Sequence, residues 1–600
     1  MNQRLNLFGI EELRNKMLDL FSIEDQQRLE YSLELYGIVY LALLYQENSE
    51  LNQEVIENVI KKEDAATLLF AIFDRYKDNI KQISTEFTEK ELNSIIFHNN
   101  VETAPKSKAY AVTPDYISKL TIKLLDVQQS DVLFDFGSGL GDFLLEVHNK
   151  HKCQKLYGID LDVEANLVAT IRHSLLQSDV EILTGNFLEK TYDSYNIDKI
   201  FIHPAFGMIR DDTDEHNQNT LKLFGETVSF KNSVWTYILA ALANLNQEGK
   251  VVCITTNNAT FNLSDFEIRK MLVEKGYLES VISLPKGLFY EIPLSVSIFI
   301  MSHGNQKIRM INAEDIYTEG RRYNSLSETD IEQIVIASMK DTEISETISH
   351  EDLAQYDYSL NPAMYIVDYE IQNSITFGEI AKQITRGAGI NKAELDALTT
   401  TEKTGYHYLM LQDIEDGIIN SKLPAISSIE EKYSKHLIKN NNLLISKNAP
   451  FKIATAEINM NEQIVATGNL YCIEIDQDKI NPIYVEAYLQ SDLGNAELSR
   501  LSKGGAFDTI SISNLKKVRI PNISREQQDQ IANKFQGLKT EQETTRKKLE
   551  RIIENKSEIW SYVKKKYKLN KQKTMLPSFV SIPAYPRIAL AINNCSDYGF

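Results

Sequence analysis

The sequence is poor in cysteine and has no long apolar run. The 600 residues include four cysteines, Cys153, Cys253, Cys472 and Cys595, and none belongs to a Cys-x-x-Cys pair. This distribution argues against a structural zinc site and a disulfide framework, and it is typical of a chain kept in a reducing compartment. No apolar stretch reaches the roughly 18 residues that span a bilayer, and the N-terminus lacks the apolar core of a signal peptide. We expect a cytoplasmic chain that enters no membrane and holds no metal.

Positive charge is also in short supply. The 64 lysine and arginine residues face 84 aspartate and glutamate residues, so the formal net charge is -20. An acidic chain is poorly suited to nucleic-acid binding that ignores base sequence, because such binding depends on the phosphates that basic groups neutralise. Sequence-specific nucleic-acid binding needs only a local basic surface, so the net negative charge does not exclude it. The chain also lacks a P-D-(x)n-(D/E)-x-K nuclease block and an ATPase phosphate loop, so a nuclease is disfavoured.

The chain divides into regions with different patterns of apolar and polar residues, and its length suffices for roughly three to five domains. Residues 1–105 carry helical patterns such as L-E-L-Y-G-I-V-Y-L-A-L-L-Y without strand alternation, which predicts an accessory helical bundle. Residues 106–310 alternate apolar strands with helical segments. A connector (311–370), a region of short strands and turns (371–530), one long helix (531–568) and a tail (569–600) follow.

Residues 106–310 predict an α/β domain. Apolar strands such as V-L-F-D-F, K-L-Y-G-I-D and V-S-I-F-I-M lack regular polar alternation, which indicates a parallel or mixed sheet covered by helices on both faces. Ligands of such sheets bind at the carboxyl ends of the strands.

A glycine-rich turn follows the first of these strands. Asp135 closes the strand, and Gly137, Gly139 and Gly141 let the backbone turn tightly beneath a ligand before a helix begins. Asp160 ends the next strand, where a carboxylate can accept hydrogen bonds from both hydroxyls of a ribose. A generic doubly wound turn or a nicotinamide site would have the same pattern. The downstream sequence fits methyl transfer better than hydride transfer, so we favour S-adenosylmethionine (AdoMet) as the cofactor.

Several motifs of this region resemble those of a known family. D-F-G-S-G-L-G-D-F-L looks like the cofactor motif of the modification subunits of type I restriction systems, with Phe136 in place of the usual Pro. A-V-T-P-D-Y-I, with Thr113 and Pro114, resembles the segment that packs against the methionine part of AdoMet. G-N-F-L resembles the family's G-D-x-L turn near the adenine ring, with Asn186 in place of Asp. V-I-S-L-P-K-G-L-F resembles the family's V-I-x-L-P-x-G-x-F signature. The resemblance covers about 105–305 and implies a class I AdoMet-dependent methyltransferase (Rossmann-like) domain that acts on adenine N6 of DNA.

The segment K-I-F-I-H-P-A-F departs from this family at the residues that contact the target amine. The family carries Asn-Pro-Pro and an aromatic residue there, whereas this chain has His203, Pro204, Ala205 and Phe206. In such a turn the Asn oxygen and a backbone carbonyl accept both N–H groups of the amine, which orients its lone pair, and the aromatic ring stacks on the flipped base. His203 can accept only as a neutral imidazole, since an imidazolium would repel a nitrogen that becomes positive. Ala205 loosens the turn.

These substitutions leave two interpretations of His203. In one interpretation His203 is a substitute acceptor that supports slow or altered methylation. In the other it is a tolerated residue in a pocket that no longer catalyses methyl transfer. Because the loss of one preorganised electrostatic partner lowers a rate by a factor of about 10²–10³, we favour impaired catalysis. The resulting prediction is an adenine-N6 DNA methyltransferase relative with a degenerate catalytic motif. The alternative is a non-catalytic, sequence-specific DNA-binding protein that retains the fold.

The carboxyl-terminal half resembles the specificity subunit of the same systems. I-T-F-G-E-I-A-K-Q-I-T-R-G-A-G looks like the start of a target-recognition domain, and L-K-K-V-R-I-P-N-I-S-R-E-Q-Q-D-Q-I resembles its exit strand and the start of its spacer helix. The resemblance covers about 371–565 and implies a mixed α+β DNA reader on the same chain as the methylase. The candidate DNA contacts are basic residues near its turns: Lys382, Arg386, Lys447, Lys503, Lys516, Lys517 and Arg519. For any single one, ordinary solvated surface is the better interpretation.

The long helix carries an interrupted apolar seam between residues 531 and 563. Steps of three and four connect Phe535, Leu538, Thr545, Leu549, Ile552, Ile559 and Val563, with Gln542 and Lys556 as interruptions. Such a seam predicts packing on the same chain, or pairing with a second copy into a homodimer that reads a two-part site. The resemblance further implies double-stranded DNA as the substrate, association with the nucleoid of a bacterial or archaeal cell, and a separate restriction subunit as the partner for any cleavage.

Overall fold

The computed structural model describes most of the chain. The described residues are 7–48, 50–98, 112–150, 153–189, 192–204, 206, 221–222, 224–289, 295–367, 369–420, 422–502 and 508–566. By its internal contacts the chain divides into two compact units, Met1–Ala532 and Asn533–Phe600. Within the described ranges, no helix is long and apolar enough to cross a membrane.

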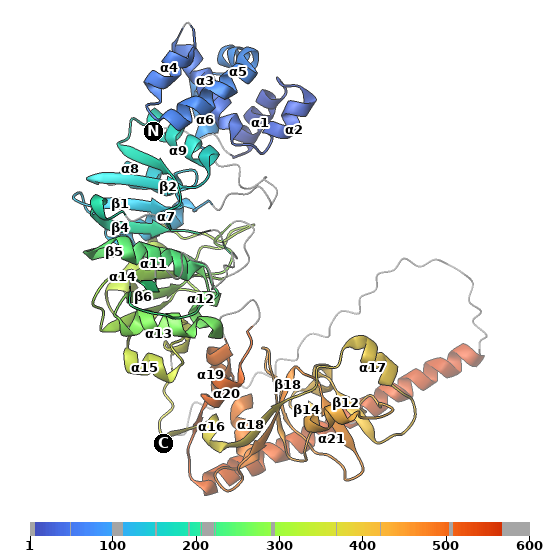
Figure 1. Ribbon diagram of the computed structural model, residues 1–600. Coiled ribbons are helices and arrows are strands. Elements are labelled where there is room, and N and C mark those ends of the chain that lie inside the picture. Colours follow the sequence, from blue (N-terminus) through green and yellow to red (C-terminus); the bar gives the residue numbers. More distant parts are fainter. Residues whose placement is uncertain are drawn as a thin grey trace. The chain divides into compact units, whose positions relative to one another are not determined.

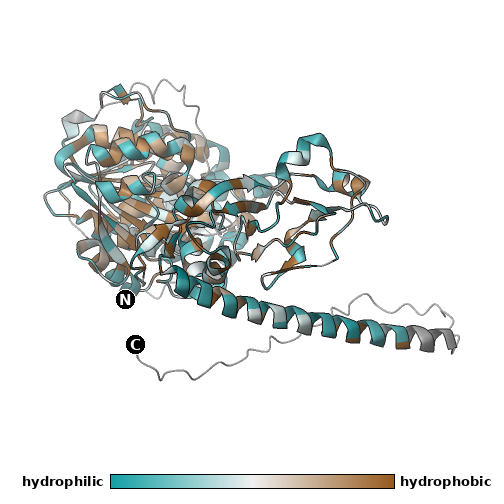
Figure 2. Ribbon diagram, turned by 90° about the horizontal axis from the view of Figure 1, so that it is seen from below, coloured by the Kyte–Doolittle hydropathy of each residue, from teal (hydrophilic) through white to brown (hydrophobic). Residues whose placement is uncertain are grey.

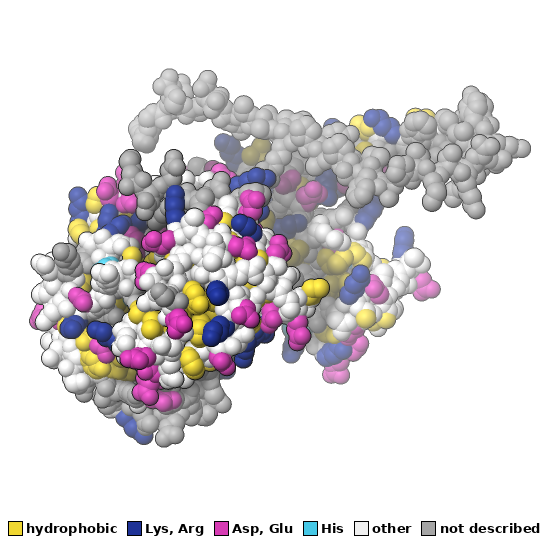
Figure 3. Space-filling model, turned by 90° about the horizontal axis from the view of Figure 1, so that it is seen from above, with side chains coloured by type: hydrophobic (Ala, Val, Ile, Leu, Met, Phe, Trp, Pro, Cys, Tyr) yellow, Lys and Arg dark blue, Asp and Glu magenta, His cyan; other side chains and the backbone are white. Residues whose placement is uncertain are grey.

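A helical bundle forms the amino-terminal part of the first unit (Figure 1). Its helices are α1 (Leu7–Leu18), α2 (Ile23–Leu29), α3 (Glu34–Glu47), α4 (Gln53–Val59), α5 (Glu63–Glu86) and α6 (Glu89–Ile96). The middle of α3, from Leu35 to Leu44, is buried on all sides, and this helix packs on α5 and α6. Side-chain caps begin three of the helices: Ser22 accepts from the backbone N–H of Asp25 at α2, Asn52 accepts from that of Val55 at α4, and Thr88 forms a capping box with Glu91 at α6. Acidic and basic side chains lie interspersed on the bundle surface seen in Figure 3.

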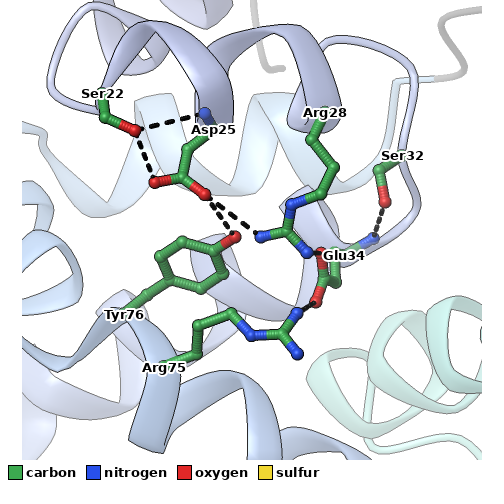
Figure 4. Close-up of polar contacts among 7 residues, drawn as sticks. All are labelled: Ser22, Asp25, Arg28, Ser32, Glu34, Arg75 and Tyr76. Atoms are coloured by element: carbon green, nitrogen blue, oxygen red, sulfur yellow. Dashed lines mark hydrogen bonds and ion pairs between the residues drawn. The ribbon is translucent and has the colours of Figure 1, made fainter.

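A polar network joins three helices of this bundle (Figure 4). Glu34 at the start of α3 pairs with Arg28 of α2 at 2.9 Å and with Arg75 of α5 at 2.8 Å. Asp25 binds Arg28 and the hydroxyl of Tyr76. Because these arginines are well exposed, each pair contributes little to stability. The apolar core between the helices contributes most of it.

The centre of the first unit is a mixed β-sheet. Its described strands run in the order β3-β2-β1-β4-β5-β7-β6-β8-β9. Their bounds are β1 (Val132–Phe136), β2 (Lys155–Asp160), β3 (Val180–Thr184), β4 (Ile197–Ile202), β5 (Leu245–Thr256), β6 (Leu278–Ser283), β7 (Val296–Met301), β8 (Lys307–Asn312) and β9 (Ser345–Ser349). The strands from β3 to β5 pair in parallel, whereas β7 is antiparallel to both β5 and β6. The predicted α/β fold is confirmed, and the apolar run V-S-I-F-I-M is β7.

Helices cover both faces of this sheet. They are α7 (Asp115–Leu125), α8 (Asp142–Lys150), α9 (Val163–Leu175), α11 (Val234–Asn244), α12 (Asn258–Phe261), α13 (Phe266–Glu274), α14 (Glu328–Met339) and α15 (His350–Gln355). Leu133 packs with α7, α8 and α14 on one face, and Phe134 packs with α11 and α13 on the other, because successive strand residues point to opposite faces. Leu167 and Ile171 of α9 belong to the core of the bundle, so α9 joins the bundle to the sheet domain (Figure 1).

Part of the segment expected to be a connector (311–370) extends the sheet instead. β9 pairs antiparallel with β8, and α14 packs on α7. The sequence of β9, S-E-T-I-S, is short and mostly polar, so no strand was expected there. Its backbone is ordered by pairing with the edge of β8, which is a tertiary effect.

The region after residue 371 is a mixed α+β structure, as predicted. Its strands are β10 (Ser374–Thr376), β11 (Ala381–Arg386), β12 (Tyr406–Leu409), β13 (Ile414–Glu415), β14 (Ile418–Ile419), β15 (Leu443–Ser446), β16 (Ile453–Thr455), β17 (Gln463–Ala466), β18 (Leu470–Ile475) and β19 (Arg519–Pro521). Its helices are α16 (Phe377–Ile380), α17 (Lys392–Leu398), α18 (Pro482–Gln490), α19 (Asp492–Ser502) and α20 (Ile512–Lys516). β11, β18, β15 and β16 form one sheet in that order. The pairing of β10 with β19 brings the first and last strands of the region together.

A buried ion cluster stabilises this region. The carboxylate of Glu497 is fully buried and accepts from Arg500 Nε at 2.6 Å and from Arg519 Nε at 2.5 Å. The hydroxyl of Tyr369 donates to the same carboxylate at 3.3 Å. Arg500 also donates to the backbone carbonyl of Met364. The cluster therefore links α19, β19 and the segment that enters the region.

The long helix α21 (Arg525–Lys566) has 42 residues. The sequence predicted a helix over 531–568, so α21 begins six residues earlier than predicted, and residues 567 and 568 lie outside the described residues. Leu538, Leu549, Ile552 and Ile559 of its apolar seam are each more than half exposed. Figure 2 shows a mostly hydrophilic helix with isolated hydrophobic residues. Pairing of this seam with a second copy stays a prediction.

Candidate functional site

A cavity of about 280 Å³ lies at the carboxyl ends of the central strands. It is lined by the turn after β1, by residues that follow β2 and β3, by residues 202–204 at the end of β4, and by residues 112 and 113 before α7. Most of the residues that the sequence suggested for a cofactor line it: Thr113, Asp135, Gly137, Gly139, Asp160 and Asn186. Of the others, Gly141 packs against α9, and Pro114 is the N-cap residue of α7.

The turn after β1 leaves its backbone open toward this cavity. Gly137 and Gly139 have φ angles of +85° and +49°, and a Cβ added to either would meet no atom within 4 Å. A side chain there would project into the space that a ligand needs. The backbone N–H of Gly139 donates to Asp160 Oδ2 at 2.8 Å, so the turn and the end of β2 hold each other in place.

The cavity is acidic. Asp135, Asp142 and Asp160 all line it. Asp135 is only 3% exposed, and its pKa is raised by burial and then by the nearby charges of Asp160 and Asp142. A cationic ligand would relieve this repulsion.

One wall of the cavity is apolar. Leu161, directly after Asp160, is 67% exposed, and Phe187 stacks on Phe136 with 4.5 Å between ring centroids. Both Leu161 and Phe187 line the cavity and suit a flat apolar ring. Neither residue was named as a site residue from the sequence, although Phe187 belongs to the G-N-F-L motif. An apolar residue directly after a strand-ending acid, such as Leu161, is a detectable signal.

His203 lies at the end of β4 and is 7% exposed. Its Nδ1 is 2.7 Å from Thr113 Oγ1, and its Nε2 is buried without a hydrogen-bond partner among the described residues. Burial lowers the pKa of the imidazole to about 4, so the ring is neutral at pH 7. The repulsion that an imidazolium would cause is therefore absent at this pH.

Aromatic rings surround His203. The ring centroids of Phe206 and Phe289 each lie 5.2 Å from that of His203, and the two phenyl rings meet edge to face at 5.5 Å. Phe206 was predicted as the stacking residue, whereas Phe289 entered only as part of a sequence signature. Pro204 lines the cavity, and Ala205 lies outside the described residues.

The side chain of Asn186 is bound within its own turn. Its Oδ1 accepts from the backbone N–H of Leu188 at 3.1 Å, and its Nδ2 donates to Glu189 at 2.9 Å. Asn186 therefore shapes the rim of the cavity after β3.

A comparison with protein families identifies this architecture. Residues 92–374 match the family model of the N-6 DNA methylases. This part of the chain belongs to that family. The antiparallel β7 between β5 and β6 is the strand order of the class I AdoMet-dependent methyltransferase fold, which the methylase domain shares.

The chain is similar to methylase subunits of type I restriction enzymes. The MjaVIII methylase subunit of Methanocaldococcus jannaschii is 26% identical over 309 residues, which are 46% of this chain and 52% of that protein. The MpnII methylase subunit of Mycoplasma pneumoniae is 22% identical over 332 residues, 49% of this chain and 61% of that protein. The chain spans about half the length of the curated relatives it matches most strongly. A solved methyltransferase subunit of a type I restriction-modification system from Streptococcus thermophilus has a TM-score of 0.44 at 15% identity, covering 60% of this chain and 99% of its own.

The residues of the cavity fit AdoMet, the cofactor of this methylase family. Its sulfonium and ammonium charges suit the cluster of Asp135, Asp142 and Asp160. Its ribose hydroxyls suit Asp160, and its adenine ring suits the apolar wall at Leu161 and Phe187.

Several of the predicted DNA contacts already bind other groups of this chain. Lys382 pairs with Asp476 at 3.2 Å, Lys517 pairs with Asp357 at 2.6 Å, Arg519 binds Glu497, and Arg386 Nε donates to the carbonyl of Gly468 at 2.7 Å. Lys516 is exposed and Lys447 is half-buried, while Lys503 lies outside the described residues. All seven remain predictions.

Proposed function

We propose that this chain is an AdoMet-dependent adenine-N6 DNA methyltransferase with its own target-recognition domain, in which His203 takes the part of the family's asparagine. The pair formed by Thr113 and His203 at the wall of the cavity carries this proposal. Thr113 Oγ1 lies 2.7 Å from His203 Nδ1, and Nε2 is buried without a partner among the described residues. A buried nitrogen without a partner is unfavourable, and a substrate N–H would satisfy it. This favours a working acceptor over a merely tolerated residue.

The protonation state of His203 decides whether it can act in this way. A pKa of about 4 leaves the ring neutral at pH 7, and a neutral imidazole has one N–H and one lone pair. When Nδ1–H donates to Thr113 Oγ1, the lone pair of Nε2 is free to accept an N–H from the adenine amine. Thr113 must therefore accept, and not donate, in this pair.

The neighbouring residues complete a binding site for the flipped base. When bound, AdoMet supplies an electrophilic methyl group. The backbone carbonyl of Pro204 accepts the second N–H of the amine, so that both acceptors orient its lone pair. Phe206 stacks on the base, and Phe289, 5.5 Å from Phe206, keeps that ring in place.

The region 371–530 serves, in this proposal, as the reader of a specific site in double-stranded DNA. Its mixed α+β fold and its position on the methylase chain support a built-in recognition function. The proposed partners are a second copy of the chain, paired through the exposed seam of α21, and a separate restriction subunit for any cleavage.

A second candidate function is sequence-specific DNA binding without methyl transfer. The side chain of Asn186 favours it, because both ends of that amide bind groups of the turn after β3. Asn186 then holds the turn and is not free to bind the adenine of AdoMet. In this alternative the fold is kept for occupancy of a DNA site.

Sequencing of genomic DNA for methyladenine, in cells that express the chain, tests the two candidates. We expect a new methylated motif with the wild type and none with His203→Phe, which keeps a ring but removes the acceptor. A motif that persists in His203→Phe would exclude His203 as the acceptor. Absence of methylation in the wild type, together with its appearance in the His203→Asn, Ala205→Pro double variant, would favour the non-catalytic alternative.

A further inference from the structure

A buried arginine joins the helical bundle to the turn that lines the cavity. Arg172, on α9, is fully buried. Its Nε donates to the carbonyl of Ile96 at 2.8 Å, and its Nη1 donates to the carbonyl of Leu140 and to Asp142 Oδ1, both at 3.1 Å. Ile96 is the last residue of α6 in the bundle, whereas Leu140 and Asp142 line the cavity. One guanidinium therefore binds both parts of the protein.

Apolar contacts reinforce this connection. The guanidinium carbon lies 5.5 Å from the centroid of the Tyr36 ring, which belongs to α3 of the bundle. Leu140 packs in one small core with Tyr36 and Leu33 of the bundle and with Ala165 and Val168 of α9. The tip of the cofactor turn is thus part of the interface between the bundle and the methylase domain.

The bundle also contacts the end of β3, a second segment beside the cavity. Lys62, just before α5, donates to Thr184 Oγ1 at 3.1 Å, and Asn166 of α9 donates to the same hydroxyl at 3.2 Å and to the carbonyl of Asp160 at 3.0 Å. Thr184 ends β3, and the residues that follow it line the cavity. The bundle therefore binds two of the segments that would enclose the cofactor.

We propose that the helical bundle controls cofactor affinity, and that Arg172 is the positioning residue through which it does so. While the bundle is docked, Arg172 holds Leu140 and Asp142 in the form that receives the cofactor. By thermodynamic reciprocity, the cofactor in turn strengthens docking of the bundle. The identity of the cofactor rests on the proposed function, whereas the coupling between bundle and turn does not.

The test compares two buried arginines of the full-length chain. Arg172→Lys keeps the charge but cannot reach all three acceptors. Arg269→Lys is the matched control, because Arg269 is equally buried and donates to the carbonyls of Tyr358, Ala259 and Asn262, away from the cavity. Titration calorimetry with AdoMet should give an affinity lower by a factor of about 10 or more for Arg172→Lys, since hydrogen bonds from a charged donor change an equilibrium constant by about that much. Arg269→Lys should bind like the wild type.

Hydrogen exchange without cofactor gives a second, independent measurement. Arg172→Lys should speed amide exchange in residues 137–145 and in α6 together, whereas Arg269→Lys should leave both unchanged. Unchanged exchange in Arg172→Lys, or equal losses of AdoMet affinity in both variants, would overturn the coupling. If the wild type binds no AdoMet, the proposed cofactor is wrong, and the exchange measurement alone decides on the coupling.

Discussion

Protonation of His203 should destabilise the methylase domain in mild acid. Burial lowers the pKa of this side chain to about 4 in the folded protein, against about 6.5 for an exposed histidine. Between these two values the unfolded chain binds more protons than the folded chain, so the free energy of unfolding falls as the pH falls. The contribution of neutral His203 is complete above about pH 6.5 and is lost as the pH falls toward the folded pKa.

The size of this effect follows from the shift. Lowering the pH from 7 to 5 should decrease the free energy of unfolding by about 2 kcal/mol through His203 alone. Because His203 is only 7% exposed, solvent screening does not reduce this figure much. Burial also lowers the pKa of His173, to about 3. Protonation of His173 therefore also lowers the free energy of unfolding over the same pH range. The difference between the wild type and His203→Gln isolates the contribution of His203, because glutamine does not titrate.

The structure provides a local fluorescent reporter for this measurement. Trp235 of α11 is fully buried and stacks on Phe299 with ring centroids 5.5 Å apart. The chain has two tryptophans, so Trp560→Phe leaves Trp235 as the single emitter. Urea unfolding at pH 7 and pH 5, followed at Trp235, should show a loss of stability that is about 2 kcal/mol larger in the wild-type background than with His203→Gln, because the contribution of His173 is common to both. Equal pH dependence in both would refute the neutral histidine and, with it, the acceptor role of His203.

Three further results are expected. Thr113→Val should slow single-turnover methylation by a factor of about 10, the effect of losing one buried hydrogen bond, and a similar loss in Thr113→Ser would contradict the role of the hydroxyl. Gly139→Ala, at a φ of +49°, should place a Cβ in the cavity and weaken AdoMet binding in calorimetry, while unchanged affinity would mean that the cofactor lies elsewhere. Glu497→Gln should leave Arg500 and Arg519 without their carboxylate and lower the stability of the region 371–530 by about 3–5 kcal/mol. Thermal unfolding checks this last result, and a shift near zero would show that the buried cluster is unimportant.

Local sequence patterns were enough for most of the methylase domain. Apolar strands without regular polar alternation, separated by helical segments, indicated its α/β class. The glycines after Asp135 and the acid at Asp160 indicated a ligand site at the carboxyl ends of the strands. These features could be predicted because each is encoded within a few neighbouring residues. β9 could not be predicted in this way, because a short polar segment becomes a strand only when β8 offers it an edge.

The amino-acid sequence alone determined the fold class, the family resemblance and the unusual residue at position 203. The tertiary structure decided the protonation state of His203. Thr113 and His203 are 90 positions apart, and the pKa of the imidazole depends on burial that no local pattern reveals. The same reason applies to Arg172, whose position on a helix gives no sign that it binds both the bundle and the cofactor turn. Periodicity encodes elements, whereas long-range packing sets the protonation, the partners and the exposure of the groups that carry the chemistry.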